Sequence, residues 1–380
     1  MDVNYDKNSL KSVLYYLKDN YGIQCFKDRR FLWMLANLMP DNQQYLELRS
    51  IDYNGLLMKI TNSISSKLET KIKLIEEARE YNKILHLRDN GKQLTILTDV
   101  IGYFDNNNCK NEELKEYDLK PIFDKLLNKL KSDDLEFAYC PAGSYMMGSP
   151  INEKGRENNE NQYKVTLSKG FYIAKKLTSC NLMNKYGIKG YYGIWKANDL
   201  PAQNANKKNA LDLCEAMNRK YAFDLPPGYF FTLPTEAQWE YACRSGSTTS
   251  LYNNLELTTE NGFCPNLDKI AWYNSNIKYK EAHRSGLKQP NNWGIYDMLG
   301  NLWEWCYDEP HPDPDKLPKE KELVDPIASN GRSVIRGGSI YDDAHSCRCA
   351  SRYPESDYIV ARHIGFRIAL APVHYSSYKP

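Results

Sequence analysis

The residues with the clearest chemical potential lie between Arg336 and Arg367, in the stretch RGGSIYDDAHSCRCASRYPESDYIVARHIGFR. Cys347 and Cys349 are separated by one residue, so on a strand their side chains would point the same way. Two thiolates placed together bind soft metal ions such as Cu(I). The alternative is a pair of partly buried thiols packed beside Ala350, since free cysteine is among the most buried residue types.

Elsewhere the sequence shows no spacing typical of a metal site or a catalytic triad. The histidines form no HExxH motif, and no phosphate loop or paired-carboxylate motif stands out. We therefore expect each histidine to be a surface or packing residue. These are His86, His283, His311, His345, His363 and His374.

The remaining residues of the segment have the composition of a contact surface. Tyrosines offer broad contact area at little entropic cost, while Asp, Ser and His supply adaptable hydrogen bonds. We predict a ligand-binding region over 341–363; an ordinary solvated loop without a partner is the alternative. Its candidate contact residues are Tyr341, Asp342, Asp343, His345, Ser346, Ser351, Tyr353, Ser356, Tyr358, Ile359, Val360 and His363.

Glycines and arginines flank this region on both sides. Gly337 and Gly338 favour a bulge or a close backbone approach, and Gly365 before Phe366 does the same on the returning strand. These flanks are expected to be scaffold that holds the intervening loop at the surface, where binding residues usually lie.

Two arginines are expected to fix the ends of this scaffold. Arg336 and Arg367 can pair with carboxylates such as Glu304 or Glu240. Buried charges need such partners, so these pairs would lock both ends of the region in place.

The motif GNLWEW predicts a strand that supports the same scaffold. Trp303 and Trp305 are two residues apart, so on a strand they share one face and leave Glu304 on the other. Large rings on one face favour burial. Gly300 permits a turn before the strand, and Asn301 can bond neighbouring backbone groups.

The carboxy-terminal part of the chain predicts mixed α and β structure with long loops. From about Leu135 onward, Gly, Pro, Trp and Tyr are frequent, and short apolar stretches alternate with polar ones. Helices are predicted at 119–130, at 210–220 and after Thr235, whose hydroxyl can cap free amides while Gln238 reaches back.

The first hundred residues have helical periodicity. Leu10, Val13, Leu14 and Leu17 recur at i, i+3, i+4 and i+7, which lines one face of a helix. We predict a small all-α domain that serves as an adaptor or oligomerisation module. The predicted boundaries are 1–104 for this domain, 105–134 for a linker and connecting helix, 135–372 for the α+β domain and 373–380 for a tail.

Composition excludes several classes of partner. The 50 basic and 48 acidic side chains almost cancel, so no global field favours nucleic acid or an anionic membrane. The sequence contains no apolar run long enough to span a membrane and no secretory signal at its start. The ten cysteines are scattered without a CxxC pair. We expect a cytoplasmic protein with free thiols, a disulfide framework being the alternative.

Four separated stretches, in order, resemble one known family. The stretches are PAGSYMMGSPINEKGRENNENQYKVTLSKGFYI at 141–173, LPTEAQWEYACRSGS at 233–247, PNNWGIYDMLGNLWEWCYDE at 290–309, and VIRGGSI with HIGFRIA at the end. Together they look like the formylglycine-generating-enzyme domain, also called sulfatase-modifying factor, a variant of the C-type lectin fold. The resemblance implies an α+β domain and a structural calcium ion near Asn301; a turn without a metal is the alternative.

The same resemblance speaks against the family's oxidation chemistry. Formylglycine-generating enzymes hold copper with two cysteines five residues apart, soon after the GGS turn. RCASR at 348–352 matches the segment that follows, but Ser339 to Ser346 contains no cysteine. Copper is therefore not expected. A related branch of iron enzymes needs a histidine triad from a helical domain, and the first 130 residues contain only His86.

A second group with this fold resembles the chain more closely: the variable proteins of diversity-generating retroelements. Their variable codons derive from Asn codons, which cannot yield Glu, Lys, Gln, Met or Trp. These five types make up 82 of 380 residues, so about five are expected among the 23 positions 341–363, and only Glu355 occurs. The candidate contact residues alternate with residues expected to be fixed. The latter are Ala344, Cys347, Arg348, Ala350, Arg352, Pro354 and Arg362.

The sequence thus predicts a non-catalytic protein that binds a protein ligand through 341–363. The amino-terminal helices would form a homo-oligomer or contact an effector protein. Two alternatives remain: a formylglycine-generating-type oxidase with a displaced metal site, and a structural adaptor.

Overall fold

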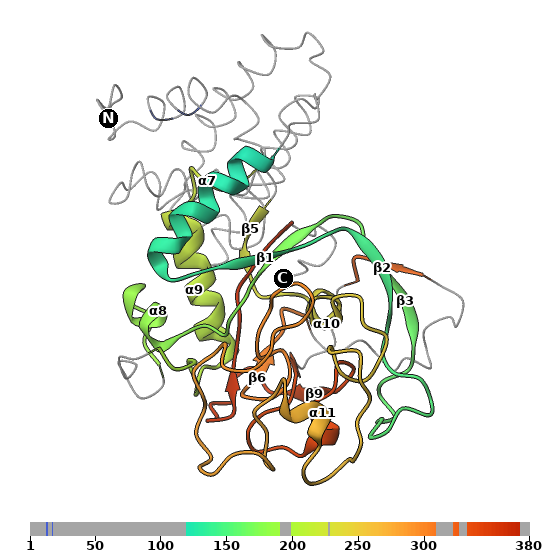
Figure 1. The fold of residues 1–380 in the computed structure, drawn as a ribbon. Coiled ribbons are helices and arrows are strands. Elements are labelled where there is room, and N and C mark those ends of the chain that lie inside the picture. Colours follow the sequence, from blue (N-terminus) through green and yellow to red (C-terminus); the bar gives the residue numbers. More distant parts are fainter. Residues whose placement is uncertain are drawn as a thin grey trace, which may run out of the picture. The chain divides into compact units, whose positions relative to one another are not determined.

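The computed structural model describes Val13, Leu17 and the residues 119–190, 199–226, 229–308, 322–326 and 333–372 (Figure 1). The chain divides into two compact units. Unit 1 consists of Met1–Lys125, Asn218–Gly228 and Pro380, and unit 2 of Leu126–Met217 and Tyr229–Lys379. Val13 and Leu17 are helical and buried. The rest of the predicted all-α domain and the predicted tail lie outside the described residues.

The longer described helices agree with the sequence prediction. They are α7 (Lys120–Leu130), α9 (Lys207–Lys220) and α10 (Glu236–Arg244). Helix α9 begins three residues before the predicted start at Ala210. Two short helices were not predicted, α8 (Cys180–Lys185) and α11 (Pro265–Asp268). Neither is long enough to display a helical period in the sequence.

Helix α10 starts with the predicted capping box. The Thr235 hydroxyl accepts a hydrogen bond from the Gln238 amide at 3.1 Å, and the Gln238 side-chain oxygen accepts one from the Thr235 amide at 3.0 Å. The helix ends at Ser245, whose backbone is left-handed. Every residue from Glu236 to Arg244 is buried. The helix therefore runs through the core and carries charged side chains into it.

One antiparallel sheet joins segments from both ends of unit 2. Its strand order is β1 (Phe137–Cys140), β4 (Phe171–Ala174), β11 (Ala369–Pro372) and β5 (Tyr229–Thr232). Strand β11 pairs antiparallel with both β4 and β5. The last described strand is thus held at the centre of the sheet.

A second sheet holds both ends of the 341–363 region. Its order is β10 (Ile364–Gly365), β6 (Trp303–Trp305), β8 (Ser333–Arg336) and β9 (Arg352–Glu355). Strands β8 and β9 pair antiparallel, and β10 runs parallel to β6. The chain leaves the sheet at β8, pairs again at β9 and returns at β10.

A third sheet has the order β2 (Gly143–Met147), β3 (Tyr163–Leu167) and β7 (Leu323–Val324). Strands β2 and β3 are joined by the loop 148–162, which we call the β2–β3 loop. Figure 1 shows this loop at the end of unit 2 that lies away from β1, and the Asn159 side chain within it approaches the Arg352 carbonyl of β9 at 3.5 Å. Irregular loops connect the three sheets, as predicted for a mixed α and β domain.

Candidate ligand-binding surface

Arg367 fixes the end of the 341–363 region from inside the core. Its guanidinium donates to both oxygens of Glu304 at 2.6 Å, and both side chains are buried. Glu304 also accepts a hydrogen bond from the indole of Trp239 at 3.0 Å. Burial alone would lower the pKa of Arg367, but the Glu304 carboxylate raises it above its ordinary value. The predicted pairing of Arg367 with a carboxylate such as Glu304 or Glu240 is confirmed, and its partner is Glu304.

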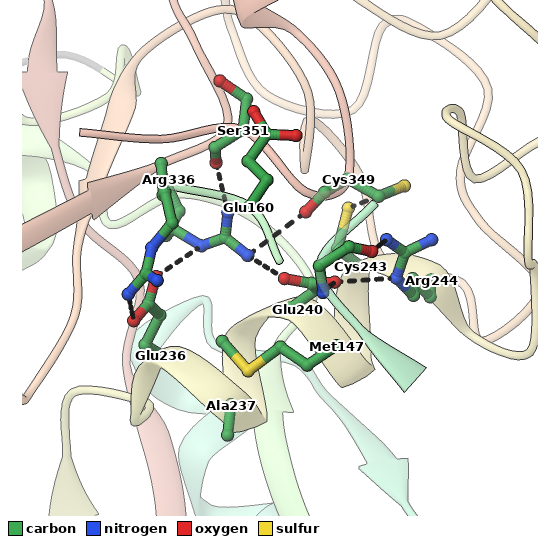
Figure 2. A network of polar contacts seen from close by, with 12 residues as sticks. Met147, Glu160, Glu236, Ala237, Glu240, Cys243, Arg244, Arg336, Cys349 and Ser351 are labelled. Carbon is green, nitrogen blue, oxygen red and sulfur yellow. Dashed lines mark hydrogen bonds and ion pairs between the residues drawn. The ribbon is translucent and has the colours of Figure 1, made fainter. Parts of the chain in front are cut away.

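Arg336 fixes the beginning of the region in the same way (Figure 2). Its guanidinium donates to Glu240, and its Nε lies 3.4 Å from Glu236 Oε1. It also donates to the carbonyl oxygens of Cys349 and Ser351. One buried cation thus joins helix α10 to the backbone just before β9. The predicted pairing of Arg336 with a carboxylate such as Glu304 or Glu240 is confirmed, and its partner is Glu240.

A third buried arginine, Arg348, ties the region to the β2–β3 loop. Its Nη1 donates to Glu153 at 2.6 Å and to Glu160 at 2.8 Å, and its Nη2 donates to Glu160 at 2.6 Å. Its Nε donates to the His345 carbonyl at 2.7 Å. No prediction from the sequence paired Arg348, because its partners lie far away along the chain.

Gly337 and Gly338 make the close approaches predicted for them. Both have positive φ angles, 98° and 75°. A Cβ on Gly337 would lie 2.8 Å from the Met298 carbonyl oxygen, and one on Gly338 would lie 2.6 Å from the sulfur of Cys347. Only glycine tolerates both the conformation and the contact. Gly365 is likewise crowded, with Leu302 at 2.8 Å from an added Cβ.

The tryptophans of GNLWEW lie as the two-residue spacing predicts. Trp305 is fully buried, and its indole donates to the Ala205 carbonyl at 2.8 Å. Trp303 is 6% exposed and donates to Asp342 at 2.9 Å. Glu304, which lies between the two tryptophans in the sequence, accepts hydrogen bonds from Trp239 and Arg367 instead. Trp303 is therefore a scaffold residue that contacts the predicted contact residue Asp342 directly.

The second half of the region carries the most exposed apolar side chains. Tyr353 is 53% exposed, Tyr358 87% and Ile359 37%. Ser356 is also exposed, and Val360 is half-buried. Tyr353 lies beside Trp303, with ring centroids 6.4 Å apart. This half therefore presents side chains that the protein's own core does not use.

The first half of the region is more strongly tied to neighbouring loops. Asp342 accepts hydrogen bonds from Trp303 and Ser339. Asp343 accepts one from the Asn274 side chain at 3.1 Å. These two carboxylates are half-buried, so they hold the loop in place as well as facing solvent.

Other candidates in the first half remain accessible. Tyr341, His345 and Ser346 are half-buried, as is His363 at the other end of the region. The His345 amide donates to the Glu260 carbonyl at 2.9 Å, which fixes its backbone.

One candidate contact residue does not lie on the surface. Ser351 is 5% exposed, and its carbonyl oxygen accepts a hydrogen bond from Arg336. Ser351 directly precedes β9 and is enclosed in the core there, which the residue type alone did not reveal. We therefore remove Ser351 from the candidate surface and place it with the scaffold.

Cys347 and Cys349 are enclosed in the core rather than partly exposed. Both are fully buried, and burial raises the pKa of Cys347 well above its ordinary value. They lie in a turn, not on a strand. Cys349 instead approaches Cys243, with the two sulfurs 3.7 Å apart. The eight described cysteines are all free and buried.

Asn301 has a left-handed backbone and is fully buried. Its side-chain oxygen accepts a hydrogen bond from the His283 amide at 3.1 Å, and its nitrogen donates to the His283 carbonyl at 2.9 Å. A calcium ion at Asn301 would have to compete with these bonds. In the described part of the chain, no group of three or more His, Cys, Asp or Glu side chains could hold a metal ion. Calcium near Asn301 stays a prediction.

None of the described helices combines the length and apolar character that a membrane crossing requires.

Comparison with known proteins identifies the family. Residues 128–372 match the family model described as the sulfatase-modifying factor enzyme 1-like domain. The formylglycine-generating enzyme of Mycobacterium tuberculosis is 32% identical over 163 residues, which cover 37% of this chain and 51% of that protein. The match therefore spans about half the length of this relative.

Two solved structures have the same fold. PvdO from Pseudomonas aeruginosa superposes with a TM-score of 0.51 at 23% identity, covering 62% of this chain and 93% of that one. Treponema denticola variable protein 1 superposes with a TM-score of 0.51 at 22% identity, covering 63% and 95%. The resemblance predicted from the sequence is confirmed. Since the family match spans more than half of the chain, the protein belongs to the family of the sulfatase-modifying factor enzyme 1-like domain and has its C-type lectin fold.

Proposed function

We propose that the protein is a non-catalytic binding protein that recognises a protein ligand through the 341–363 region. The segment 1–104 would then form a homo-oligomer or contact an effector protein, in the cytoplasm.

The observation that carries the proposal is the distribution of exposure along 341–363. Most residues expected to be fixed are buried: Ala344, Cys347, Arg348, Ala350 and Arg352. The candidate contact residues between them are exposed or half-buried, apart from Ser351. Such interleaving lets the exposed side chains change while the buried ones keep the loop in place.

The exposed residues also have the chemistry of a protein-binding face. Large apolar side chains are exposed to water at Tyr353, Tyr358 and Ile359, although other residues of the same region are buried in the core. Tyrosines near the centre of a contact surface commonly contribute much of the binding energy. We therefore assign the central contacts to Tyr353 and Tyr358.

Selection of displayed random peptides on the immobilised full chain tests this assignment. Enriched peptides should bind the Tyr353→Ala, Tyr358→Ala double variant about tenfold or more weakly than the wild type. Tyr139→Ala is the matched control, since Tyr139 on β1 is 54% exposed, compared with 53% for Tyr353. Equal binding to the wild type and the double variant would contradict the proposal and favour a structural adaptor.

Diversification of the region forms a separate part of the proposal. It rests on the scarcity of residue types that mutated Asn codons cannot produce. DNA sequencing around the gene should show a near-copy of this region, with AAC or AAT at the varied positions, beside a reverse-transcriptase gene. Absence of both would remove diversification without affecting ligand binding.

A formylglycine-generating-type oxidase is the second candidate, because the chain is 32% identical to such an enzyme over 163 residues. The close thiols of Cys243 and Cys349 are the pair that a displaced copper site would need. Burial raises the pKa of Cys243 well above its ordinary value, which disfavours the thiolate that binds metal. We expect no tight Cu(I) binding by the reduced protein and no oxidation of a Cys-x-Pro-x-Arg peptide. Tight binding together with turnover would establish the enzyme.

A further inference from the structure

The loop around 278–281, which precedes the GNLWEW strand, lies against the 341–363 region. The hydroxyl of Tyr341 donates to the Lys280 carbonyl oxygen at 3.0 Å. The Lys280 ammonium lies over the Tyr341 ring, 5.3 Å from its centroid. The Tyr341 ring also contacts the His363 ring, with centroids 5.8 Å apart and an interplanar angle of 66°. Tyr341 therefore joins the loop at Lys280 to the opposite end of the region at His363.

This loop presents an exposed tyrosine between two lysines. Tyr279 is 69% exposed, and the Lys278 ammonium lies 5.4 Å from its ring centroid. Lys278 and Lys280 are both exposed, and within the described residues neither ammonium has a carboxylate partner. Each is placed by an aromatic ring, and each can still accept an anion.

The carboxylates closest to Tyr341 in the sequence are already occupied. Asp342 accepts hydrogen bonds from Trp303 and Ser339, and Asp343 accepts one from Asn274. Glu281, next to Lys280, is exposed and leaves the stretch 278–281 with a net charge of +1. The free charge that this edge offers to a ligand is thus positive.

We infer that 278–280 is a fixed, cationic edge of the binding surface, and that the protein ligand places Asp or Glu side chains against it. The inference rests on the proposed function, because it assumes that Tyr353 and Tyr358 provide the central contacts. Charged groups at the rim of an interface mainly set specificity and association rate, while buried aromatic groups give most of the affinity. A lysine held over an aromatic ring is directed before the ligand arrives, which lowers the entropic cost of the contact.

The peptide selection described above tests the inference through the composition of the enriched peptides. They should contain more Asp and Glu than the unselected library. Each enriched peptide is then bound to the wild-type full chain, to Lys278→Glu with Lys280→Glu, and to Lys169→Glu as the matched control. Lys169 is exposed in the turn between β3 and β4 and lies outside the 341–363 region.

The double charge reversal should weaken binding about tenfold or more at low salt, and the difference should shrink as salt is added. The Lys169→Glu control should stay within about twofold of the wild type. Glu281→Gln should strengthen binding, because it removes the negative charge beside Lys280. This opposite sign distinguishes a charge effect from local damage to the loop.

The outcomes separate this inference from the proposed function. Peptides that depend on Tyr353 and Tyr358 but lack acidic residues, or that tolerate both charge reversals, would overturn the inference alone. Peptides that do not depend on the tyrosines, or no enriched peptides, would overturn the proposed function and the inference with it. Equal competition by a single-stranded oligonucleotide would show a general polyanion site and would also overturn the inference.

Discussion

At the scale of single residues, the binding region depends on arginines that are enclosed with carboxylates. Arg336, Arg348 and Arg367 are fully buried, and each donates to at least one glutamate. Removing one partner of such a pair leaves an uncompensated charge in the core. These positions are therefore expected to tolerate substitution far less than the exposed residues between them.

Arg348→Met tests this expectation at one position. It removes the cation that holds Glu153 and Glu160 while keeping similar apolar volume. We expect the free energy of unfolding to fall by about 3–5 kcal/mol. Chemical denaturation of the variant measures the loss. Arg362→Met is the control, since Arg362 is exposed, and an equal loss in both variants would refute the role of burial.

The buried carboxyl group of Asp308 is expected to make the stability of the folded protein depend on pH. Its Oδ1 accepts a hydrogen bond from the Glu236 amide at 2.5 Å, and its Oδ2 has no hydrogen-bond partner among the described residues. Burial, and then the Glu236 carboxylate, raises its pKa from 3.8 to about 7. The folded state therefore binds this proton more tightly than the unfolded state. The stabilising contribution is complete below the unfolded pKa and is lost as the pH rises through 7.

Asp308→Asn keeps an oxygen for the Glu236 amide and removes the titration. The variant should gain stability relative to the wild type as the pH rises from 4 to 8, by roughly 2–4 kcal/mol. Unfolding free energies measured at several pH values check the slope. Asp212→Asn on the exposed side of α9 is the control; a constant difference between Asp308→Asn and the wild type would contradict the prediction.

Residue chemistry allowed carboxylate partners such as Glu240 or Glu304 to be predicted for Arg336 and Arg367, because a buried charge needs a partner, but it did not show which glutamate each arginine contacts. The pairing of Arg348 could not be predicted in this way. Its partner Glu160 lies 188 residues away, and nothing in the loop 148–162 distinguishes Glu160 from its charged neighbours. The contact between Lys280 and Tyr341 was missed for the same reason, since it depends on how two loops meet in space.

At the scale of elements, helix α10 is the best-predicted part of the fold. The T-x-x-Q pattern specifies its first turn locally, and the capping box forms as expected. The two-residue strands β7 and β10 have no such local signal. They exist because other strands lie beside them, so only the tertiary structure defines them.

The cap of α10 gives a prediction at this scale. Thr235→Ala leaves the Gln238 amide without its acceptor in a buried position. We expect the free energy of unfolding to fall by about 1 kcal/mol. Thr248→Ala, at an exposed position after the helix, should change stability by less than about half that amount. Denaturant titration measures the stability of both variants. It shows whether the loss of stability comes from the missing cap or follows the removal of any threonine side chain.

Strand β9 lies at the edge of the second sheet and carries the predicted contact residue Tyr353, yet its edge disfavours pairing with a strand of another protein. Pro354 has no amide hydrogen to offer, and the Arg352 carbonyl is approached by the Asn159 side chain at 3.5 Å. Such features commonly protect sheet edges. Ligand contact at β9 is therefore expected through the side chain of Tyr353 rather than through the backbone.

At the scale of the whole molecule, unit 2 separates what holds the fold from what faces solvent. Arg336, Gly337, Gly338, Phe366 and Arg367 are buried around the ends of the region. Tyr353, Tyr358 and Ile359 extend outward from it. A fold arranged in this way can accept many surface sequences, provided that the buried residues stay the same.

This separation leads to a prediction about the intact chain. A variant with Tyr353→Asn, Ser356→Arg, Tyr358→Asp and Ile359→Thr changes four exposed side chains at once. We expect its Tm to stay within about 2 °C of the wild type, since surface substitutions usually change stability little. The single variant Arg367→Met, in contrast, leaves Glu304 buried without its cation and should lower Tm by about 10 °C or more. Thermal unfolding of both proteins compares them directly. If the fourfold variant unfolded as early as Arg367→Met, the exposed residues would belong to the fold itself, and an exchangeable binding surface would be untenable.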